Sequence, residues 1–346
     1  MKATYKQYIL DFKRPSGTSR GVMTQKETWF LILEQDGRKG IGECGLLRGL
    51  SADDRPDYES KLQWVCDNVH LGEDRLYESL SEFPSIQFGI EMAFRSLASE
   101  DPFVLFPSEF TKGTHSIPIN GLVWMGDLNF MKQQIEQKLE QGFTCIKLKI
   151  GALDFRKELQ LLQEIRRKFS VNQIEIRVDA NGAFSTISAS HKLSQLAGLE
   201  IHSIEQPIAK NQHDSLSDLC KSAPIPVALD EELIGIFKTE EKEELLRKIR
   251  PQFIILKPSF SGGFRGTLEW ISIAEKYKIG WWITSALESN IGLNAIAQFT
   301  YTLNNPMPQG LGTGSLYTNN FDCPLDVRNG ALHYDPEVKW ETQNFI

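Results

Sequence analysis

From about residue 116 onward, short apolar runs alternate with longer stretches in which apolar residues recur every three or four positions. The short runs are typical of buried strands and the longer stretches of amphipathic helices, for example over 154–169 and 265–278. The predicted strands are 116–124, 145–150, 174–181, 203–208, 226–232, 253–259, 280–288 and a weak eighth at 308–314. This repetition predicts a parallel sheet, either open and doubly wound or closed into a barrel. The number of strands favours the barrel.

The residues before about 112 follow another pattern, with strands first and helices afterwards. Alternating apolar residues at 4–12, 28–37 and 40–47 predict a strand meander, and helical spacing follows at 53–69 and 85–99. We therefore expect an α+β module here. No GxGxxG motif follows the first strand of the later repeat, so a dinucleotide-binding domain has no support.

The composition is that of a soluble globular protein: of 346 residues, 41% are apolar and 24% are charged. The net charge of −7 and the lack of a basic run argue against a nucleic acid partner, because phosphate binding needs a cationic surface. No apolar run is long enough to span a membrane and no signal-peptide pattern occurs, so we expect a cytoplasmic protein without a membrane partner. Five scattered cysteines without metal-ligand spacing are expected to be reduced. A small molecule is the expected ligand, and the sequence leaves homo-oligomerisation open.

Charged residues interrupt the apolar strands of the repeat, each near the C-terminal end of its strand. They are Lys147, Lys149, Asp179, Glu205, Asp230 and Lys257. In a barrel of parallel strands these ends meet at one mouth, where catalytic groups lie. Any one of these residues alone is better explained as part of a solvated strand face or as the start of a loop. Three carboxylates from three consecutive strands, with lysines on both sides, predict a converging site instead.

Three carboxylates that converge on one point repel each other unless a cation lies among them. Oxygen ligands from Asp and Glu select a hard ion, so we predict Mg²⁺ as the cofactor. Such an ion beside a substrate carboxylate would stabilise the anion that forms when the α-proton leaves. A lysine near a second ammonium group and a metal is expected to have a lowered pKa, which would leave some neutral amine as a base. We expect one of Lys147 and Lys149 to be this base and the other to lower its pKa.

The order of the motifs KxK, DxN, EQP, DE and KP along the chain resembles the enolase superfamily, in its muconate lactonizing enzyme subgroup. Segments 40–51 and 285–299 are similar to the GxGE segment of that subgroup's capping domain and to its seventh-strand segment. The resemblance implies an N-terminal α+β capping domain at 1–112 and a TIM-like (β/α)7β barrel at 113–315. The segment 316–346 is expected to return to the capping domain.

The same resemblance implies roles for the charged residues. The Mg²⁺ ligands would be Asp179, Glu205 and Asp230. Lys149 would be the acid and base on one face of the substrate, with Lys257 on the other face. Asn181 and Glu231 would support the ligands from behind. The polar loop 13–25 corresponds to a capping loop that closes over the site and excludes water.

Within the subgroup, the residues favour the o-succinylbenzoate synthases. The seventh strand lacks the histidine of mandelate racemase-like members, and segment 310–317 lacks the DxD motif of dipeptide epimerases. The LKPS segment at 256–259, together with Arg177, Ser285 and Glu288, resembles the synthase pattern, and we expect these three side chains to bind substrate. For Arg177 an internal ion pair is an equal alternative.

The activity implied by this resemblance is the dehydration of 2-succinyl-6-hydroxy-2,4-cyclohexadiene-1-carboxylate to 2-succinylbenzoate in menaquinone biosynthesis. An N-acylamino acid racemase or a dipeptide epimerase of the same superfamily remains the alternative, and the racemase shares all the polar groups named above. A non-catalytic binding protein would be expected to lose a metal ligand or the KxK pair. Neither is lost in this sequence.

Overall fold

The computed structural model describes residues 1–18, 21–124 and 126–341. Its N-terminal part is built on three antiparallel strands in the order β1-β2-β3. They are β1 (Lys2–Thr18), β2 (Gly21–Gln35) and β3 (Arg38–Cys44). A two-residue turn joins β2 to β3, and its residues Asp36 and Gly37 have φ values of 52° and 76°. Positive φ at both positions suits the right-handed twist of a hairpin.

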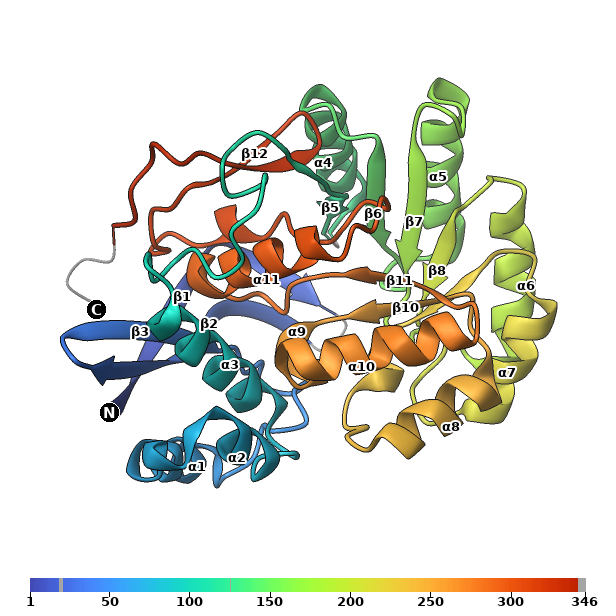
Figure 1. Ribbon diagram of the computed structural model, residues 1–346. Coiled ribbons are helices and arrows are strands. Elements are labelled where there is room, and N and C mark those ends of the chain that lie inside the picture. Colours follow the sequence, from blue (N-terminus) through green and yellow to red (C-terminus); the bar gives the residue numbers. More distant parts are fainter. Residues whose placement is uncertain (19–20, 125, 342–346) are drawn as a thin grey trace.

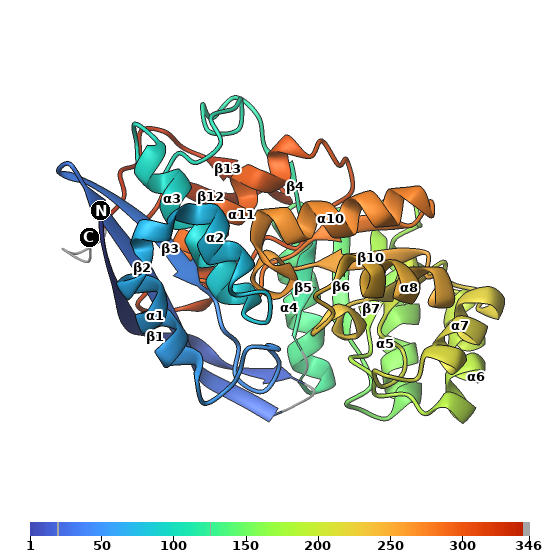
Figure 2. The same ribbon diagram turned by 60° about the horizontal axis from the view of Figure 1, so that its bottom comes forward.

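Three helices pack against this sheet and share one apolar core with it. They are α1 (Tyr58–Asp67), α2 (Gly72–Glu78) and α3 (Pro84–Ala98), with the short 3₁₀ helix η1 (Val69–Leu71) between the first two. Glycine lets α3 lie close to β3, because a Cβ atom on Gly42 would lie 1.9 Å from the carbonyl oxygen of Gly89. The predicted α+β module is confirmed and is drawn in blue to teal in Figures 1 and 2.

The larger part of the chain is a curled sheet of parallel strands that follow one another in sequence order. The strands are β5 (Gly121–Val123), β6 (Cys145–Lys149), β7 (Glu175–Asp179), β8 (Ser203–Glu205), β9 (Val227–Leu229), β10 (Phe253–Leu256) and β11 (Gly280–Ile283). The strand-helix repeat predicted from the sequence is confirmed.

Helices follow the strands and form the outer layer, as Figure 1 illustrates for α5 to α8 and α10. The helices are α4 (Leu128–Glu140), α5 (Phe155–Lys168), α6 (Thr186–Ala197), α7 (His213–Ser222), α8 (Thr239–Ile249), α10 (Gly263–Lys276) and α11 (Asn290–Thr302), with the single turns η2 (Glu231–Leu233) and α9 (Pro258–Ser261). In the described ranges, none of the helices is both long and apolar enough to cross a membrane.

The gap between the first and last strands of this sheet is bridged by the segment after α11. Gln309 forms a parallel bridge with Ile119, and Gly310 forms another with Thr284. These two residues are what remains of the weak eighth strand predicted at 308–314. One proline and three glycines in that segment disfavour a longer ladder. With this bridge the arrangement corresponds to the expected (β/α)7β barrel.

The C-terminal segment forms a small sheet and contacts the first strand of the chain. The sheet has the order β12-β13-β4 and consists of β4 (Ile117–Pro118), β12 (Leu325–Arg328) and β13 (Ala331–Tyr334). Tyr317, which follows the 3₁₀ helix η3 (Gly314–Leu316), forms an antiparallel bridge with Phe12 of β1. Residues 342–346 of the predicted returning segment lie outside the described residues. The domain bounds expected from the sequence stay a prediction.

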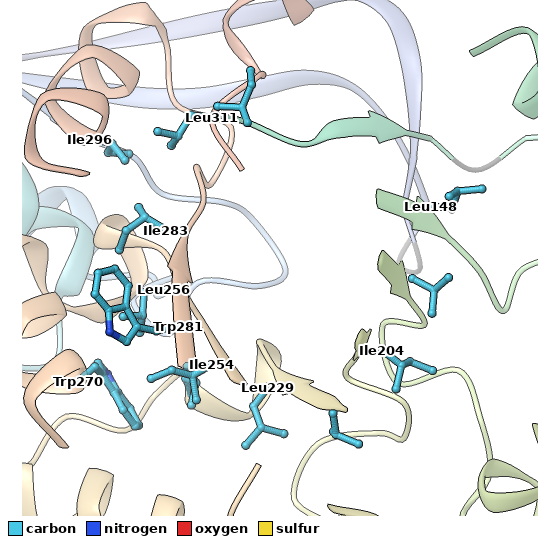
Figure 3. Close-up of a cluster of buried hydrophobic side chains, with 14 of the residues drawn as sticks. Leu148, Ile204, Leu229, Ile254, Leu256, Trp270, Trp281, Ile283, Ile296 and Leu311 are labelled. Carbon is cyan, nitrogen blue, oxygen red and sulfur yellow. The ribbon is translucent and has the colours of Figure 1, made fainter. Parts of the chain in front are cut away.

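Side chains of the barrel strands alternate between an apolar outer layer and the inner face of the barrel, which carries charged residues as well as the apolar residues Ala228, Ile255 and Trp282. Leu148, Ile204 and Leu229 belong to the buried apolar cluster drawn in Figure 3. On β6, Leu148 alternates with Lys147 and Lys149, whose side chains are only 13% and 15% exposed. Because neighbouring residues of a strand point to opposite faces, the two lysines lie on the inner face of the barrel.

Two carboxylates of the N-terminal part lie at the start of barrel helices. Glu43 of β3 accepts hydrogen bonds from the amides of Ser289 and Gly292 at the N-terminus of α11, both at 2.9 Å. Glu91 of α3 accepts a hydrogen bond from the amide of Phe264 at the N-terminus of α10, at 2.5 Å. The first amides of a helix have no partner within the helix, so these carboxylates complete them. The N-terminal part is thus attached on the side of β10 and β11.

Candidate active site

The parallel register aligns charged residues across neighbouring strands. Lys149 of β6 pairs with Asp179 of β7, which in turn pairs with Glu205 of β8. Asp230 directly follows β9, and Lys257 directly follows β10. Parallel strands lie about 4.8 Å apart, so side chains at one level of the same face can reach each other. The strand ends thus bring the three predicted carboxylates and the lysines to one mouth of the barrel.

Asp179 lies at the centre of this mouth and contacts two lysines. Its Oδ2 is 2.7 Å from Lys149 Nζ and 3.0 Å from Lys147 Nζ, and Lys147 also pairs closely with Glu205. Asp179 is fully buried. Burial raises the pKa of Asp179, but the ammonium groups of Lys147 and Lys149 lower it by more, so that this pKa lies far below its usual range. The two ammonium groups thus favour the charged form of Asp179.

The pKa of Glu205 is shifted in the opposite direction to that of Asp179. Burial and the negative charges of Asp179 and Asp230 raise the pKa of Glu205 well above its ordinary value, although Lys147 acts in the other direction. Its Oε1 is buried and has no hydrogen-bond partner among the residues that the structure describes. Crowded carboxylate oxygens, one of them unpartnered, are a donor set that fits a hard divalent cation.

As the described part of the chain stands, no group of three His, Cys, Asp or Glu residues is arranged to hold a metal ion. The carboxylates form ion pairs with lysine ammonium groups instead. Asp230 Oδ2, for example, lies 2.5 Å from Lys257 Nζ. A bound ion would therefore replace ammonium groups as the partners of these oxygens.

Two lysines of this arrangement have a raised pKa, whereas the lowered pKa expected for a lysine beside a bound metal stays a prediction. Burial lowers the pKa of Lys147, but Asp179, Glu205 and Asp230 raise it by more. Burial likewise lowers the pKa of Lys257, and Asp230 and Glu205 again raise it by more. The physical reason is that direct carboxylate partners stabilise an ammonium group more than burial destabilises it. The sequence could not give these distances.

Asn181 connects the two sides of the carboxylate cluster. Its Oδ1 accepts a hydrogen bond from Lys149 Nζ at 2.8 Å, and its Nδ2 donates to Glu231 Oε1 at 2.8 Å. Its backbone amide donates to Asp179 Oδ1 at 3.0 Å. The φ of Asn181 is 43°, in the left-handed region that asparagine tolerates better than most residues. Asn181 and Glu231 thus lie directly beside the predicted base and metal ligands.

The mouth opens into a pocket with one charged wall and several apolar ones. The charged and amide residues that line it are Asn120, Lys147, Lys149, Asn181, Glu205, Asp230, Glu231 and Lys257. Met23, Leu47 and Leu50 line it from the N-terminal part, and Trp282 lines it from β11. Apolar walls exclude water, which strengthens interactions between charges. Met23 belongs to the predicted capping loop, of which residues 19–20 lie outside the described residues.

Of the three predicted substrate contacts, Ser285 lines the pocket and Arg177 does not. Arg177 Nε pairs with Glu175 Oε1 at 2.7 Å, and its guanidinium carbon lies 4.4 Å from the ring centroid of Trp282. Of the two interpretations given for Arg177, the ion pair is the one found. Arg177 lies two residues before Asp179 on β7, and so one level deeper in the barrel.

The prediction that Glu288 contacts substrate is wrong. Glu288 is fully buried and does not line the pocket. Its Oε1 accepts a hydrogen bond from Ser259 Oγ at 2.5 Å, and its Oε2 accepts one from the amide of Ala286 at 2.7 Å. The predicted strand 280–288 ends at Ile283, and the chain turns at Leu287 with a φ of 64°. Strand alternation therefore no longer sets the direction of Glu288.

Apolar pocket residues were missed by the sequence interpretation. They include Leu47, Leu50, Leu122, Trp124, Phe260 and Trp282. An apolar residue in or beside a strand is assigned to the core, because the sequence pattern does not show whether its side chain packs against other residues or lines a cavity. Only their positions could have indicated that they line the pocket. Leu47 and Leu50 lie in segment 40–51, and Phe260 follows the KPS motif.

Segment 310–317 contributes small and hydroxyl groups to the pocket. Gly310, Gly312 and Thr313 line it, and Thr313 Oγ1 lies 2.6 Å from Ser285 Oγ. A substrate ammonium group would find hydroxyl oxygens there but no carboxylate from this segment. This chemistry agrees with the argument against a cationic substrate.

Comparison with known proteins places these features in context. A family model described as enolase C-terminal domain-like matches residues 131–337. The chain is 46% identical to the o-succinylbenzoate synthase of Desulfotalea psychrophila, over 96% of this chain and 98% of that protein. The crystal structure of MenC from the same organism superposes with a TM-score of 0.87 at 43% identity, over 96% of this chain and 99% of that one. The L-Ala-D/L-Glu epimerase of Bacillus subtilis is 28% identical over 59% of this chain and 54% of that protein.

Proposed function

The chain belongs to the enolase superfamily, and we propose that it catalyses the dehydration of 2-succinyl-6-hydroxy-2,4-cyclohexadiene-1-carboxylate to 2-succinylbenzoate, a step of menaquinone biosynthesis. The observation that carries this choice is the 46% identity to an o-succinylbenzoate synthase over nearly the full length of both chains. The pocket supports it with lysines, carboxylates and apolar walls suited to a small anionic ring. The chain is accordingly a lyase.

Enzymes of this superfamily are metal-dependent, and Mg²⁺ is their typical ion. Asp179, Glu205 and Asp230 would hold the ion in this chain, because they are the carboxylates of three consecutive strand ends. When bound, Mg²⁺ supplies positive charge beside the substrate carboxylate and so lowers the free energy of the anion formed in the first half-step.

Lys149 acts as base and then as acid. Its neutral Nζ takes the proton from carbon 1 of the ring, next to the carboxylate. The carbon–oxygen bond at carbon 6 then breaks with its electron pair on oxygen, and the Lys149 ammonium returns the proton, so that water leaves and the ring becomes aromatic. Asn181 holds the Lys149 amine by a hydrogen bond of 2.8 Å. A single residue can serve both half-steps when the proton and the hydroxyl leave from the same ring face.

The other two lysines act without transferring a proton. Lys257 lines the pocket from the end of β10, two strands beyond Glu205. Its ammonium stabilises the delocalised anion by charge. Lys147 lies between Asp179 and Glu205 and contacts both. Its role is to hold these two carboxylates at the mouth. The apolar contacts from Met23 and Leu47 exclude water that would otherwise weaken these interactions.

A second candidate is racemisation of an N-acylamino acid. One observation favours it: Lys149 and Lys257 both line the pocket, and a racemase needs a base on each face of the substrate. The similarity to a dipeptide epimerase, at 28% identity over 59% of this chain, is compatible with it but weaker than the similarity to the synthase. The absence of a carboxylate in segment 310–317 counts against dipeptides with a free amino group.

The test is a side-by-side assay of the purified chain with Mg²⁺ on the cyclohexadiene carboxylate and on a panel of N-acylamino acids and dipeptides. We expect kcat/KM for dehydration in the ordinary enzyme range of about 10⁴ to 10⁸ M⁻¹s⁻¹, far above any racemisation. Efficient racemisation with negligible dehydration would overturn the proposal.

The Lys257→Ala variant distinguishes the two reactions further. In the synthase reaction it should slow turnover without abolishing it, because Lys257 provides charge and no proton. In a racemase it should stop racemisation while one enantiomer still exchanges its α-proton in D₂O. Proton NMR of the recovered N-succinylamino acid measures this exchange.

A further inference from the structure

Three charged side chains lie buried together outside the pocket, where the N-terminal sheet meets the barrel. They are Lys26 of β2, Glu43 of β3 and Glu288 in the loop after β11, each at most 3% exposed. The two glutamate side chains are close neighbours, since a Cβ atom on Gly292 would lie 2.7 Å from Glu43 Oε2 and 2.8 Å from Glu288 Cβ. Buried like charges are costly unless an opposite charge offsets them. The reaction described above uses none of the three.

Glu43 is fully occupied by hydrogen bonds. Its Oε1 accepts from Thr28 Oγ1 at 2.8 Å and from the amide of Ser289 at 2.9 Å. Its Oε2 accepts from Ser289 Oγ at 2.5 Å and from the amide of Gly292 at 2.9 Å. This carboxylate therefore fixes the start of α11 against the N-terminal sheet.

Glu288 ties together two loops that shape the pocket. Its Oε1 binds Ser259 Oγ, which lies two residues after Lys257, and its Oε2 binds the amide of Ala286. Ala286 lines the pocket, as do the flanking Ser285 and Leu287. A displacement of Glu288 would move the wall of the pocket and the loop that follows Lys257.

Lys26 provides the positive charge next to these carboxylates but does not hydrogen-bond to them. Its Nζ is buried and has no hydrogen-bond partner within the described ranges. Burial lowers the pKa of Lys26, whereas the charges of Glu43 and Glu288 act in the opposite direction. Lys26 lies two residues before Thr28, on the same face of β2, and Thr28 Oγ1 donates to Glu43, so the Lys26 side chain lies on the side of the sheet that faces these carboxylates.

We propose that Lys26 is a positioning residue for the substrate pocket. Its ammonium balances the charges of Glu43 and Glu288, and this balance keeps Glu288 on Ser259 and Ala286 and so keeps the pocket wall in place. Lys26 would then determine substrate affinity from the N-terminal sheet without touching the substrate. The kinetic test of this inference rests on the proposed function, whereas the unfolding test does not.

The experiment compares charge-unbalanced and charge-balanced variants of the full-length protein. Lys26→Met removes the cation at similar length, Glu288→Gln removes one carboxylate, and the double variant removes both. Lys242→Met is the matched control, because Lys242 is also only 3% exposed but pairs with Glu269 on the outer helices, away from the pocket. Initial rates with the cyclohexadiene carboxylate and urea unfolding are measured for all four.

We expect Lys26→Met to raise KM about tenfold or more while kcat stays within about threefold, since binding geometry is lost and Lys149 is untouched. The double variant should return KM to within about threefold of the parent, because the two sites are coupled. Lys242→Met should lower stability and change KM less than about twofold.

Two results would overturn the proposal: an unchanged KM in Lys26→Met, or a double variant whose KM is no lower than that of Lys26→Met. If Lys26→Met does not fold, the double variant decides, because the proposal requires it to fold and to bind substrate normally. If the parent protein does not dehydrate the substrate, the proposed function fails. The unfolding cycle then still tests the charge balance, which predicts that Glu288→Gln restores the stability lost in Lys26→Met.

Discussion

The barrel mouth and the contact between the N-terminal sheet and the barrel both bury charged residues, but in different surroundings. At the mouth, lysines and carboxylates face a pocket, and Glu205 Oε1 has no hydrogen-bond partner among the described residues. At the contact, both oxygens of Glu43 are occupied by backbone amides and hydroxyl groups. The comparison indicates that charges beside a cavity can exchange partners with a ligand. Charges enclosed by backbone donors hold the fold together.

The largest difference between the two regions should follow from removing the metal. Treatment with a chelator should reduce dehydration to background, and added Mg²⁺ should restore it, because the carboxylates at the mouth would hold the ion. The urea midpoint should hardly change, since the contact region contains no ion-dependent group. Activity assays and unfolding curves on the same chelated sample measure both effects. Full activity after chelation would contradict the metal assignment.

Replacement of the base comes next in size. Lys149→Ala should lower kcat by about 10²- to 10⁴-fold, because general acid-base catalysis contributes about that much. The free energy of unfolding should stay within about 1 kcal/mol, since the lost ion pair with Asp179 leaves that carboxylate a second partner in Lys147. Initial rates measure the loss of kcat, and urea unfolding measures the change in stability. A variant that loses stability as strongly as activity would place Lys149 with the structural charges.

The contact region should show the reverse behaviour. Glu43→Ala removes the acceptor for the amides of Ser289 and Gly292 and leaves Lys26 with one carboxylate fewer. We expect a loss of about 3 to 5 kcal/mol in the free energy of unfolding, the usual effect of breaking a buried, charged hydrogen-bond network. Glu43→Gln keeps one acceptor oxygen and should lose less. Equal stability of Glu43→Ala and the parent protein would remove the distinction between the two regions.

The residues at the barrel mouth could be predicted from the sequence because two periodicities determine where their side chains lie. Strand alternation gives the face of Lys147 and Lys149, and the strand-helix repeat gives the end of each strand at which a charge stands. The prediction went wrong at Glu288, where the turn at Leu287 ends the alternation. Lysine pKa values depend on distances between strands, which a sequence pattern does not contain.

The contact region could not be predicted, because long-range packing creates it. Lys26 lies near the exposed start of a strand, and its sequence context gives no sign that it is only 3% exposed or that the charge of Glu288, more than 250 residues away, acts on it. Met23 and Leu47 likewise become pocket residues only when the N-terminal sheet meets the barrel. A local pattern carries information about a strand's own faces and none about what approaches them.

The smallest expected effect concerns a carboxylate buried in the N-terminal part alone. Asp53 is fully buried, and its Oδ2 accepts hydrogen bonds from the amide and the hydroxyl of Ser85 at 2.8 and 2.6 Å. Burial raises the pKa of Asp53 to about 6, although the Ser85 hydrogen bonds act in the other direction. The folded protein thus binds this proton more tightly than the unfolded chain does. The contribution to stability is complete below about pH 4 and is lost as pH rises through about 6.

Asp53→Asn should therefore stabilise the protein at pH 7 by about 1 to 3 kcal/mol, because the amide keeps an acceptor for Ser85 and carries no charge. Urea unfolding at several pH values between 4 and 8 tests this: the gain over the parent protein should grow up to about pH 6 and then level off. Asp54→Asn is the matched control. Although burial raises the pKa of Asp54, hydrogen bonds from the Gly49 amide and Arg48 lower it by more, so this variant should show no such gain. A gain for Asp53→Asn that is independent of pH would mean that packing, and not the buried charge, determines the stability of this region.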